Sequence, residues 1–409
     1  MASHVTLLRD MRYPTPHELA LAGRALADEH PGRVRMRQAG VSRGGRPLWL
    51  LSVDGQSGGP REVLVVAGAH ANEPVGGATA LDLARRVIRA GGGGAGWHFL
   101  LCADPDGADL HRTPRPDSLL DYHRNFYRPP GPEQPEWAPS LLPPDRLPPE
   151  TRTLTALLDR LRPVLQVSLH GTDLGGSWVQ LTRDVPGLAE PFGKSAAELR
   201  IPVETRASDA NGWGTPGPGI FVMPRSGSED TRLSTWCHHG TTAIVEVPMW
   251  ASHIVDDPAP HPDPRAALRM LAERLTGETA RVAGLREGVA AAGPGAAALL
   301  RAVDWTLGLI PQVTAEWTAP GAPAEATTAS LGSIDAFGRR LSLRTAAMLL
   351  RVLRSQAHPS APALDRLVTG WCEEFSARFQ ARWVPVATQV EHQSRTVLAA
   401  YGCLQTGQA

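Results

Sequence analysis

The chain has 409 residues, which exceeds one average domain and favours a large domain with an appendage. Its 41 basic side chains balance 41 acidic ones, so neither nucleic acid nor a charged membrane surface is expected as a partner. The sequence has no run of 18 apolar residues, no signal-peptide core at its start and no CxxC pair among its four cysteines, so we expect a cytoplasmic protein with free thiols and no membrane span.

The first part of the chain alternates between helical and strand patterns. Apolar residues at helical spacing predict a helix over 15–32, and alternating residues around a turn at Ser42–Gly45 predict a hairpin over 33–55. The Pro-rich stretch 113–149 has no periodicity, and long loops of this kind usually line a site. The remaining elements are expected as strand, helix, strand with turn, helix, strand and strand, at residues 62–69, 74–90, 97–107, 151–163, 164–171 and 241–250.

This alternation predicts an α/β fold with a mixed, mostly parallel central sheet flanked by helices on both faces. After about residue 285 the pattern becomes entirely helical, interrupted by the Pro-, Ala- and Thr-rich stretch 318–330. We therefore predict a catalytic domain over 1–285 and a helical extension over 286–409 that covers the cleft or forms a homodimer. Large apolar residues of the extension are expected in its core or in a dimer interface: Trp305, Leu309, Leu349, Leu350 and Phe379.

The segment "GAHANEP" (68–74) places His70 and Glu73 directly after a buried strand. At a strand-to-helix turn, this spacing lets both side chains reach one point. His170 follows another apolar strand, and strand ends of a parallel sheet converge at one edge. A hydrolytic zinc site needs three such ligands and one open position for water, so these residues are predicted to bind Zn²⁺. Each part has an alternative interpretation when it is considered alone. His70 and Glu73 would belong to an ordinary polar loop, and His170 would be a hydrogen-bonded structural histidine.

Glu246 lies inside the apolar strand sequence "AIVEVP". A buried carboxylate is costly unless it is paired or used in chemistry. Burial also raises a carboxyl pKa toward neutrality, which suits a general base. We therefore predict that Glu246 is the catalytic base, with a structural salt bridge to an arginine as the alternative.

This ordered set resembles the zinc carboxypeptidase family, in which His-x-x-Glu precedes a second His and then a Glu. The flanking segments "YPTPHELALAGRALADEHPG" and "GVSRGGRPLWLLSV" are similar to the amino-terminal part of that family. "DPDG" (104–107) resembles its Asn-Pro-Asp-Gly turn with Asp104 in place of Asn, and "HRNF" (123–126) resembles its Asn-Arg-Asn-Phe segment. The resemblance covers roughly residues 13–285 and implies zinc ligands at His70, Glu73 and His170, with Glu246 as the base.

The resemblance also implies substrate-binding residues. Arg124 would hold the carboxylate of the substrate, although His123 replaces the family's preceding Asn. Either Arg112 or Arg115 would stabilise the oxyanion. Glu229, in "GSED" (227–230), would lie at the bottom of the specificity pocket and favour a basic side chain or an amine, with a solvated loop carboxylate as the alternative.

Two departures from the family pattern widen the range of functions. No tyrosine occurs between Tyr127 and Tyr401, so the tyrosine that closes over the substrate is missing, and the carboxylate clamp is altered. The leading hypothesis is a zinc hydrolase of peptide or amide bonds, and the alternative is a small-molecule amidohydrolase or deacylase resembling the aspartoacylase and desuccinylase branch. A non-catalytic binding module with structural zinc is the third. His238 and His239 are either a second metal site or ordinary polar residues.

Overall fold

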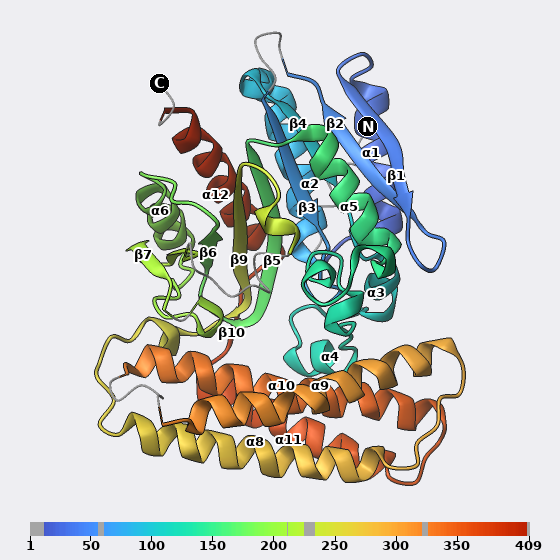
Figure 1. The fold of residues 1–409 in the computed structure, drawn as a ribbon, viewed down its shortest axis with the longest axis vertical. Helices are drawn as coiled ribbons and strands as arrows, with labels where there is room; N and C mark the ends of the chain where they lie inside the picture. Colours follow the sequence, from blue (N-terminus) through green and yellow to red (C-terminus); the bar gives the residue numbers. More distant parts are fainter. Residues whose placement is uncertain (1–11, 56–60, 211, 225–233, 321–325, 407–409) are drawn as a thin grey trace.

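The structure is a computed structural model that describes residues 12–55, 61–210, 212–224, 234–320 and 326–406. Its described strands form one mixed ten-stranded sheet, flanked by helices, with a bundle of long helices across one edge (Figure 1). In chain order the strands are β1 (Val34–Val41), β2 (Pro47–Val53), β3 (Glu62–Ala67), β4 (Gly96–Leu100), β5 (Leu165–Gly175), β6 (Trp178–Leu181), β7 (Gly214–Gly217), β8 (Ile220–Val222), β9 (Thr241–Ala251) and β10 (Arg382–Trp383).

The sheet has the spatial order β1-β2-β4-β3-β5-β9-β6-β8-β7, and β10 pairs with the end of β9. Its centre is parallel, because β4, β3, β5 and β9 all run in one direction. Antiparallel pairs occur toward both sides, at β1 with β2 and at β6 with β9. The predicted α/β fold class, a mixed sheet flanked by helices, is confirmed, and the parallel pairing is concentrated at the centre of the sheet.

The α-helices divide between the two faces of the sheet and the bundle. They are α1 (Pro16–Glu29), α2 (Val75–Ala90), α3 (Pro105–Leu110), α4 (Leu119–Arg124), α5 (Pro149–Leu161), α6 (Ala189–Leu199), α8 (Pro264–Arg286), α9 (Pro294–Thr318), α10 (Thr328–Ser355), α11 (Ala361–Phe379) and α12 (Val386–Thr406). Short 3-10 turns are η2 (Gly91–Gly94), η3 (Gly131–Glu133), η4 (Ala138–Ser140), η5 (Pro144–Arg146), η6 (Ser208–Ala210), η7 (Thr235–Cys237) and η8 (His253–Asp256).

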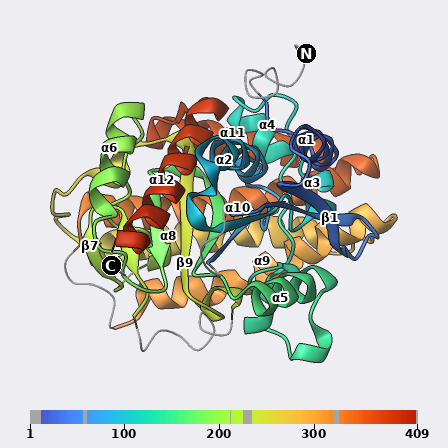
Figure 2. The ribbon, with the colours of Figure 1, turned by 90° about the horizontal axis from the view of Figure 1, so that it is seen from above.

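Alternation along β3 shows how the sheet is covered on both faces. Val63 and Val65 belong to a core shared with α1, α2, α6 and α12, whereas Leu64 and Val66 pack with residues of α5. Figure 2 shows α5 on one side of the sheet and the other four helices on the opposite side. Because side chains of a strand alternate between faces, apolar residues in succession are typical of a strand buried on both sides.

Local sequence signals explain the ends of the helices that frame the site. Thr15 and Glu18 form a capping box at the start of α1. Pro74 precedes α2, and Gly91 ends it in the left-handed conformation, with φ of 79°. The amino terminus of α2 is therefore fixed just beyond the carboxyl end of β3.

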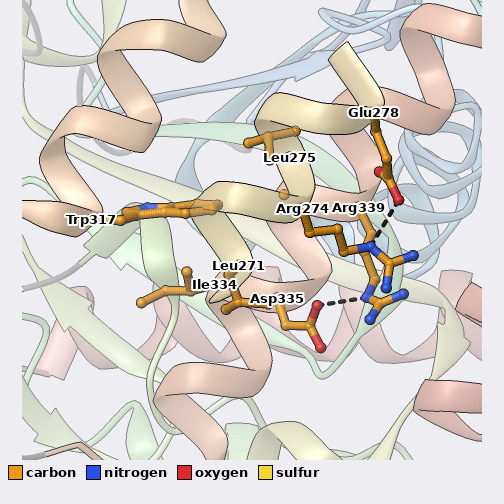
Figure 3. A pocket seen from close by; sticks show the side chains of 9 residues that line it. Leu271, Arg274, Leu275, Glu278, Trp317, Ile334, Asp335 and Arg339 are labelled. Carbon is orange, nitrogen blue, oxygen red and sulfur yellow. Dashed lines mark hydrogen bonds and ion pairs between the residues drawn. The ribbon is translucent and has the colours of Figure 1, made fainter. Parts of the chain in front are cut away.

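The helical bundle consists of α8, α9, α10 and α11, and it crosses the sheet at the edge where β5 and β9 end (Figure 1). Arg274 and Glu278 of α8 face Asp335 and Arg339 of α10 around a cavity of about 10 Å³, and ion pairs join Arg274 to Glu278 and Arg339 to Asp335 (Figure 3). A cavity of this size holds at most about one water molecule. It is a packing gap lined by ion pairs rather than a ligand site.

The limits of this bundle differ from the boundary expected at residue 285. The helical part begins at Pro264, because α8 packs on α9 and α10. At the other end, α12 leaves the bundle and packs on α2, α6 and β9. The division into domains at 285 and 286 stays a prediction, and the chain from 264 onward contributes to both parts of the fold.

Several elements were not expected from the sequence. The stretch 113–149 contains α4 and three 3-10 turns, and the segment after β5 adds β6, α6, β7 and β8. The short strands are flanked by Gly and Pro, which mask strand alternation in the sequence. Among the described residues, no helix has the length and apolar character that crossing a membrane requires.

Asp104 provides a test of how buried charge affects this fold. Its side chain caps α3 by accepting a hydrogen bond from Gly107 N at 2.8 Å, and it is only 1% exposed. Burial raises the pKa of Asp104 to about 7. The folded state therefore binds this proton more tightly than the unfolded chain, whose Asp titrates near pH ~3.9, and stability is lost as pH rises from about 4 through 7.

We expect Asp104→Asn to raise the free energy of unfolding by about 2–4 kcal/mol at pH 8 and by much less at pH 4, because the amide keeps the capping oxygen but carries no charge. Urea unfolding of both proteins at the two pH values measures the difference. Asp145→Asn, at an exposed position, is the control and should change neither value. Equal effects of Asp104→Asn at both pH values would contradict the assignment.

Candidate metal centre and catalytic cavity

The loop between β3 and α2 holds two of the predicted zinc ligands. Glu73 N donates a hydrogen bond to His70 O at 3.1 Å, which closes a tight turn just before α2. In this turn His70 Nδ1 lies 3.0 Å from each carboxylate oxygen of Glu73. Both side chains are buried. The tight turn thus brings the two side chains to one point, as their spacing predicts.

His170 and Glu246 reach the same point from the central strands. They are register partners on the parallel strands β5 and β9. His170 Nδ1 lies 2.9 Å from Glu73 Oε2 and 3.8 Å from Glu246 Oε1. The ligand atoms of His70, Glu73 and His170 all lie within 4.8 Å of one another.

A second layer of residues fixes the two histidines. His170 Nε2 donates to Glu136 Oε2 at 3.0 Å, and Glu136 also accepts a hydrogen bond from Ser168 Oγ at 2.6 Å. On the other side, Arg128 donates to His70 Nε2 at 2.9 Å and to Glu73 Oε1 at 3.2 Å. In both histidines Nδ1 therefore faces Glu73, while Nε2 is held by a partner outside the group.

Burial and charge shift the pKa of each group strongly. Burial lowers the pKa of His70 to about 4, and the Arg128 cation acts in the same direction. Although burial opposes it, the neighbouring histidines hold the pKa of Glu73 well below its usual range. Burial, with the Glu73 carboxylate nearby, raises the pKa of Glu246 to about 8. Two carboxylates in one pocket thus have pKa values that move in opposite directions.

The donor set fits zinc. Two imidazole nitrogens and one carboxylate are ligands that zinc accepts, and catalytic zinc sites keep three protein ligands and one open position. The Glu136 carboxylate behind His170 is the outer partner that metal-bound histidines usually have. Within the part of the chain that the structure describes, a second group of this kind is Asp159 with His238 and His239, and it lies at the surface.

The metal centre opens into a cavity of about 660 Å³. This volume lies within the range of small-molecule sites, roughly 300–1,000 Å³. Glu246 and Arg128 line it beside the predicted ligands, and α9 and α10 contribute a further wall. The lining includes five tryptophans, Trp137, Trp178, Trp213, Trp236 and Trp305. The helical part thus covers the cleft, one of the two roles expected for it, and a homodimer stays a prediction.

The structure places both candidate oxyanion residues away from the cavity. Arg112 pairs with Asp109 at 2.8 Å, and Arg115 pairs with Asp121 at 2.5 Å. Both guanidinium groups are largely exposed and neither lines the cavity. A nearby carboxylate holds each of them at the surface.

The predicted carboxylate clamp is also turned away from the cavity. Arg124 donates to Asp365 and Thr369 of α11, at 2.9 and 3.0 Å. His123 is fully buried 3.9 Å from Asp173, and burial lowers its pKa to about 3. Because α4 packs against α11, these two side chains point to the bundle and do not line the cavity.

The remaining predicted residues lie elsewhere. Glu229 is outside the described residues. Leu349, Leu350 and Phe379 are core residues, as expected, whereas Trp305 and Leu309 line the cavity.

Sequence reasoning missed several residues that the fold brings to the site: Arg128, Glu136, Glu204, Arg340 and Arg344. Arg128 and Glu136 come from the stretch 113–149, whose length was the only available signal. The other three depend on contacts between distant parts of the chain, which no local pattern encodes.

Comparison with known families agrees with this geometry. Residues 22–175 match the sequence model of zinc carboxypeptidases. This segment is thus similar to the zinc carboxypeptidase family. It contains the three predicted ligands of Zn²⁺, the ion that this family uses, and supports a metallopeptidase-like hydrolase. Glu246 lies beyond the matched segment, so its role rests on the geometry of the site.

Solved structures give weaker likenesses. A metallo-carboxypeptidase from Burkholderia cenocepacia aligns with a TM-score of 0.38 and 17% identity over 58% of this chain and 60% of its own. A candidate metallopeptidase from Shewanella amazonensis aligns with a TM-score of 0.40 and 16% identity over 57% of this chain and 84% of its own. Bovine thrombin-activatable fibrinolysis inhibitor, solved in complex with tick carboxypeptidase inhibitor, aligns with a TM-score of 0.34 and 16% identity over 57% of this chain and 86% of its own. No curated protein matches the chain in sequence.

We expect the purified zinc carboxypeptidase-like protein to contain about one zinc per chain, and His170→Ala to lose it, because the variant removes one of three ligands. Elemental analysis after removal of loosely bound metal measures both. His239→Ala tests the surface group with Asp159 and should keep the zinc. If His170→Ala kept the zinc and His239→Ala lost it, the zinc would have to be assigned to the surface group instead.

Proposed function

We propose that the protein is a zinc-dependent hydrolase that cleaves a peptide or amide bond with Glu246 as its general base. The observation that carries this proposal is the position of Glu246. It is the register partner of His170, lies 3.8 Å from that residue's Nδ1 and lines the cavity beside the three-residue group. A purely structural zinc site is usually closed by a fourth protein ligand and has no use for such a neighbour.

Bound zinc supplies a Lewis acid that lowers the pKa of a water molecule, polarises a carbonyl and favours the ionised form of a neighbouring carboxyl such as Glu246. Glu246 then accepts the proton of the attacking water and returns it to the leaving amine. Its backbone carbonyl accepts a hydrogen bond from Ser177 Oγ at 2.6 Å, which helps hold this part of β9 in place. A fixed carboxylate within reach of the reacting atoms is what general base catalysis requires.

Arg128 is the cation that we assign to the developing oxyanion, in place of Arg112 and Arg115. It lines the cavity and contacts both His70 and Glu73. If His70 held the metal through Nδ1, the atom that faces Glu73, its proton would lie on Nε2. Nε2 would then no longer accept a hydrogen bond from Arg128, and the guanidinium would be available to a carbonyl oxygen.

Two observations favour short amide substrates, as in the deacylase alternative. Helices α9 and α10 form a wall of the cavity, and Arg124 is turned toward α11. A cavity of about 660 Å³ matches a dipeptide or an N-acyl amino acid in size. Release of a free amino acid from the carboxyl end of a peptide, or of an acyl group from an N-acyl amino acid, distinguishes the two activities.

Glu246→Gln should keep about one zinc per chain and lower kcat by at least about 10³-fold on any amide that the wild type cleaves, because the amide cannot accept a proton. Chromatography of both types of product against a panel of N-acyl dipeptides and N-acyl amino acids measures this loss. Glu204→Gln, at another buried carboxyl of the cavity, is the comparison variant. Unchanged turnover in Glu246→Gln would remove this residue as the base.

Arg128→Gln should lower kcat by about 10²–10³-fold, the usual cost of losing one oxyanion donor. Arg112→Gln and Arg115→Gln are matched controls, because their guanidinium groups are exposed and paired outside the cavity. Both controls should retain wild-type kcat. Loss of activity in either control with full activity in Arg128→Gln would return the role to the sequence-based candidates.

A further inference from the structure

Helix α10 brings two arginines into the cavity. Arg340 and Arg344 are one helical turn apart, and both line the cavity near Thr172. They lie outside the segment that matches the zinc carboxypeptidase family, so the family match does not account for them. Arg339, their neighbour on the same helix, instead pairs with Asp335 in the bundle (Figure 3). It also pairs with Glu374 of α11.

Both arginines are anchored by one carboxylate. Asp173 is fully buried and lies on β5, three residues after His170. Its oxygens lie 3.3 Å from Arg340 Nη1 and 3.0 Å from Arg344 Nη2. Arg340 also donates to Thr172 Oγ1 at 2.9 Å. Two cations share one anion, so this cluster keeps one positive charge.

Part of the hydrogen-bonding capacity of this cluster is unused. Arg344 Nε is buried without a hydrogen-bond partner, and its guanidinium stacks 4.7 Å from the centre of the Phe126 ring, another residue of the cavity. Stacking and the Asp173 contact fix the orientation of this guanidinium group, whose Nε–H has no partner. A planar guanidinium fixed in this way suits two-point binding of a carboxylate.

The other carboxylates of the cavity have nearer partners, and Glu204 acts on Arg340 and Glu73 on Arg344 only through space. Glu73 belongs to the predicted metal ligands and contacts Arg128, and Glu246 lies beside them. Glu204 accepts a hydrogen bond from Gly176 N at 3.1 Å, and its burial raises its pKa to about 7. Asp209 contacts Ser208. The surplus positive charge of α10 therefore faces the cavity near β5, the strand that carries His170.

We propose that Arg340 and Arg344 bind a carboxylate of the substrate, the task that the resemblance assigned to Arg124. This inference rests on the proposed function and specifies its substrate class. The substrate is the amide of a short acid with a free carboxylate close to the scissile bond. An aromatic or apolar group of the same molecule contacts the tryptophan-rich wall of the cavity.

Direct binding tests this proposal without turnover. Zinc-loaded full-length Glu246→Gln protein is titrated calorimetrically with two acid and amide pairs, N-acetyltryptophan with its carboxamide and N-acetylglycyl-phenylalanine with its carboxamide. The acids should bind at least about 10-fold more tightly than the amides, as expected for charge-assisted hydrogen bonds. Adding Arg340→Gln or Arg344→Gln should abolish this preference, whereas Arg124→Gln and Arg339→Gln should retain it.

The lysine variants Arg340→Lys and Arg344→Lys keep a cation beside Asp173 and so protect the fold. They should weaken binding of the acids by about 10-fold, because an ammonium cannot make the two-point contact. Equal binding of acid and amide, or a preference that survives in the glutamine and lysine variants alike, would overturn the proposal. So would a preference that depends on Arg124.

Kinetics of the zinc-loaded wild type keep the two proposals apart. Absence of amide hydrolysis together with an arginine-dependent preference for acids would reject the hydrolase and retain the carboxylate site. Hydrolysis of carboxamide-blocked substrates at the same kcat/KM as the free acids would retain the hydrolase and reject the carboxylate site. Where acids are cleaved, Arg340→Lys should raise KM more than it lowers kcat.

Discussion

A buried carboxylate at the edge of a sheet needs positive charge or hydrogen-bond donors around it, and Glu73 meets this need with His70, His170 and Arg128. The side chains that contact Glu73 need hydrogen-bond partners of their own. His170 also needs an acceptor for its Nε2–H, and Glu136 provides it. The Glu136 carboxylate is in turn held by Ser168, two residues before His170 on β5. One carboxylate therefore explains why a layer of polar side chains lies beneath an otherwise apolar sheet.

The same edge also explains why the helical bundle belongs to the site. Asp173, three residues after His170, is buried only because α10 brings Arg340 and Arg344 to it. The contact joins the strand of a predicted ligand to the wall of the cavity. The sheet supplies the groups that do chemistry, and the bundle supplies groups that fit recognition of a substrate. Detaching the helices would leave Asp173 without its partners and open one side of the cavity.

The sequence predicts the metal group and the central sheet because both depend on local patterns. His70 follows the end of the apolar strand β3, and His170 lies within the apolar strand β5 beside it, so the parallel centre of the sheet brings the two residues together. The arginines could not be predicted in this way. Whether Arg124 or Arg128 faces the cavity depends on the packing of α4 against α11, since the two residues are close in sequence but have different partners. The order of motifs alone favoured Arg124.

Precision at this site also depends on the helix farthest along the chain. Gln393 of α12 donates to the backbone carbonyls of His170 at 2.5 Å and of Val245 at 3.1 Å. One amide thus ties together the two strands that carry His170 and Glu246, from the face opposite the α5 layer. Because α10 holds β5 through Asp173, the strand is fixed at His170 itself and again three residues later. The last helices of the chain therefore act together with the sheet, since one positions the strands and another completes the cavity.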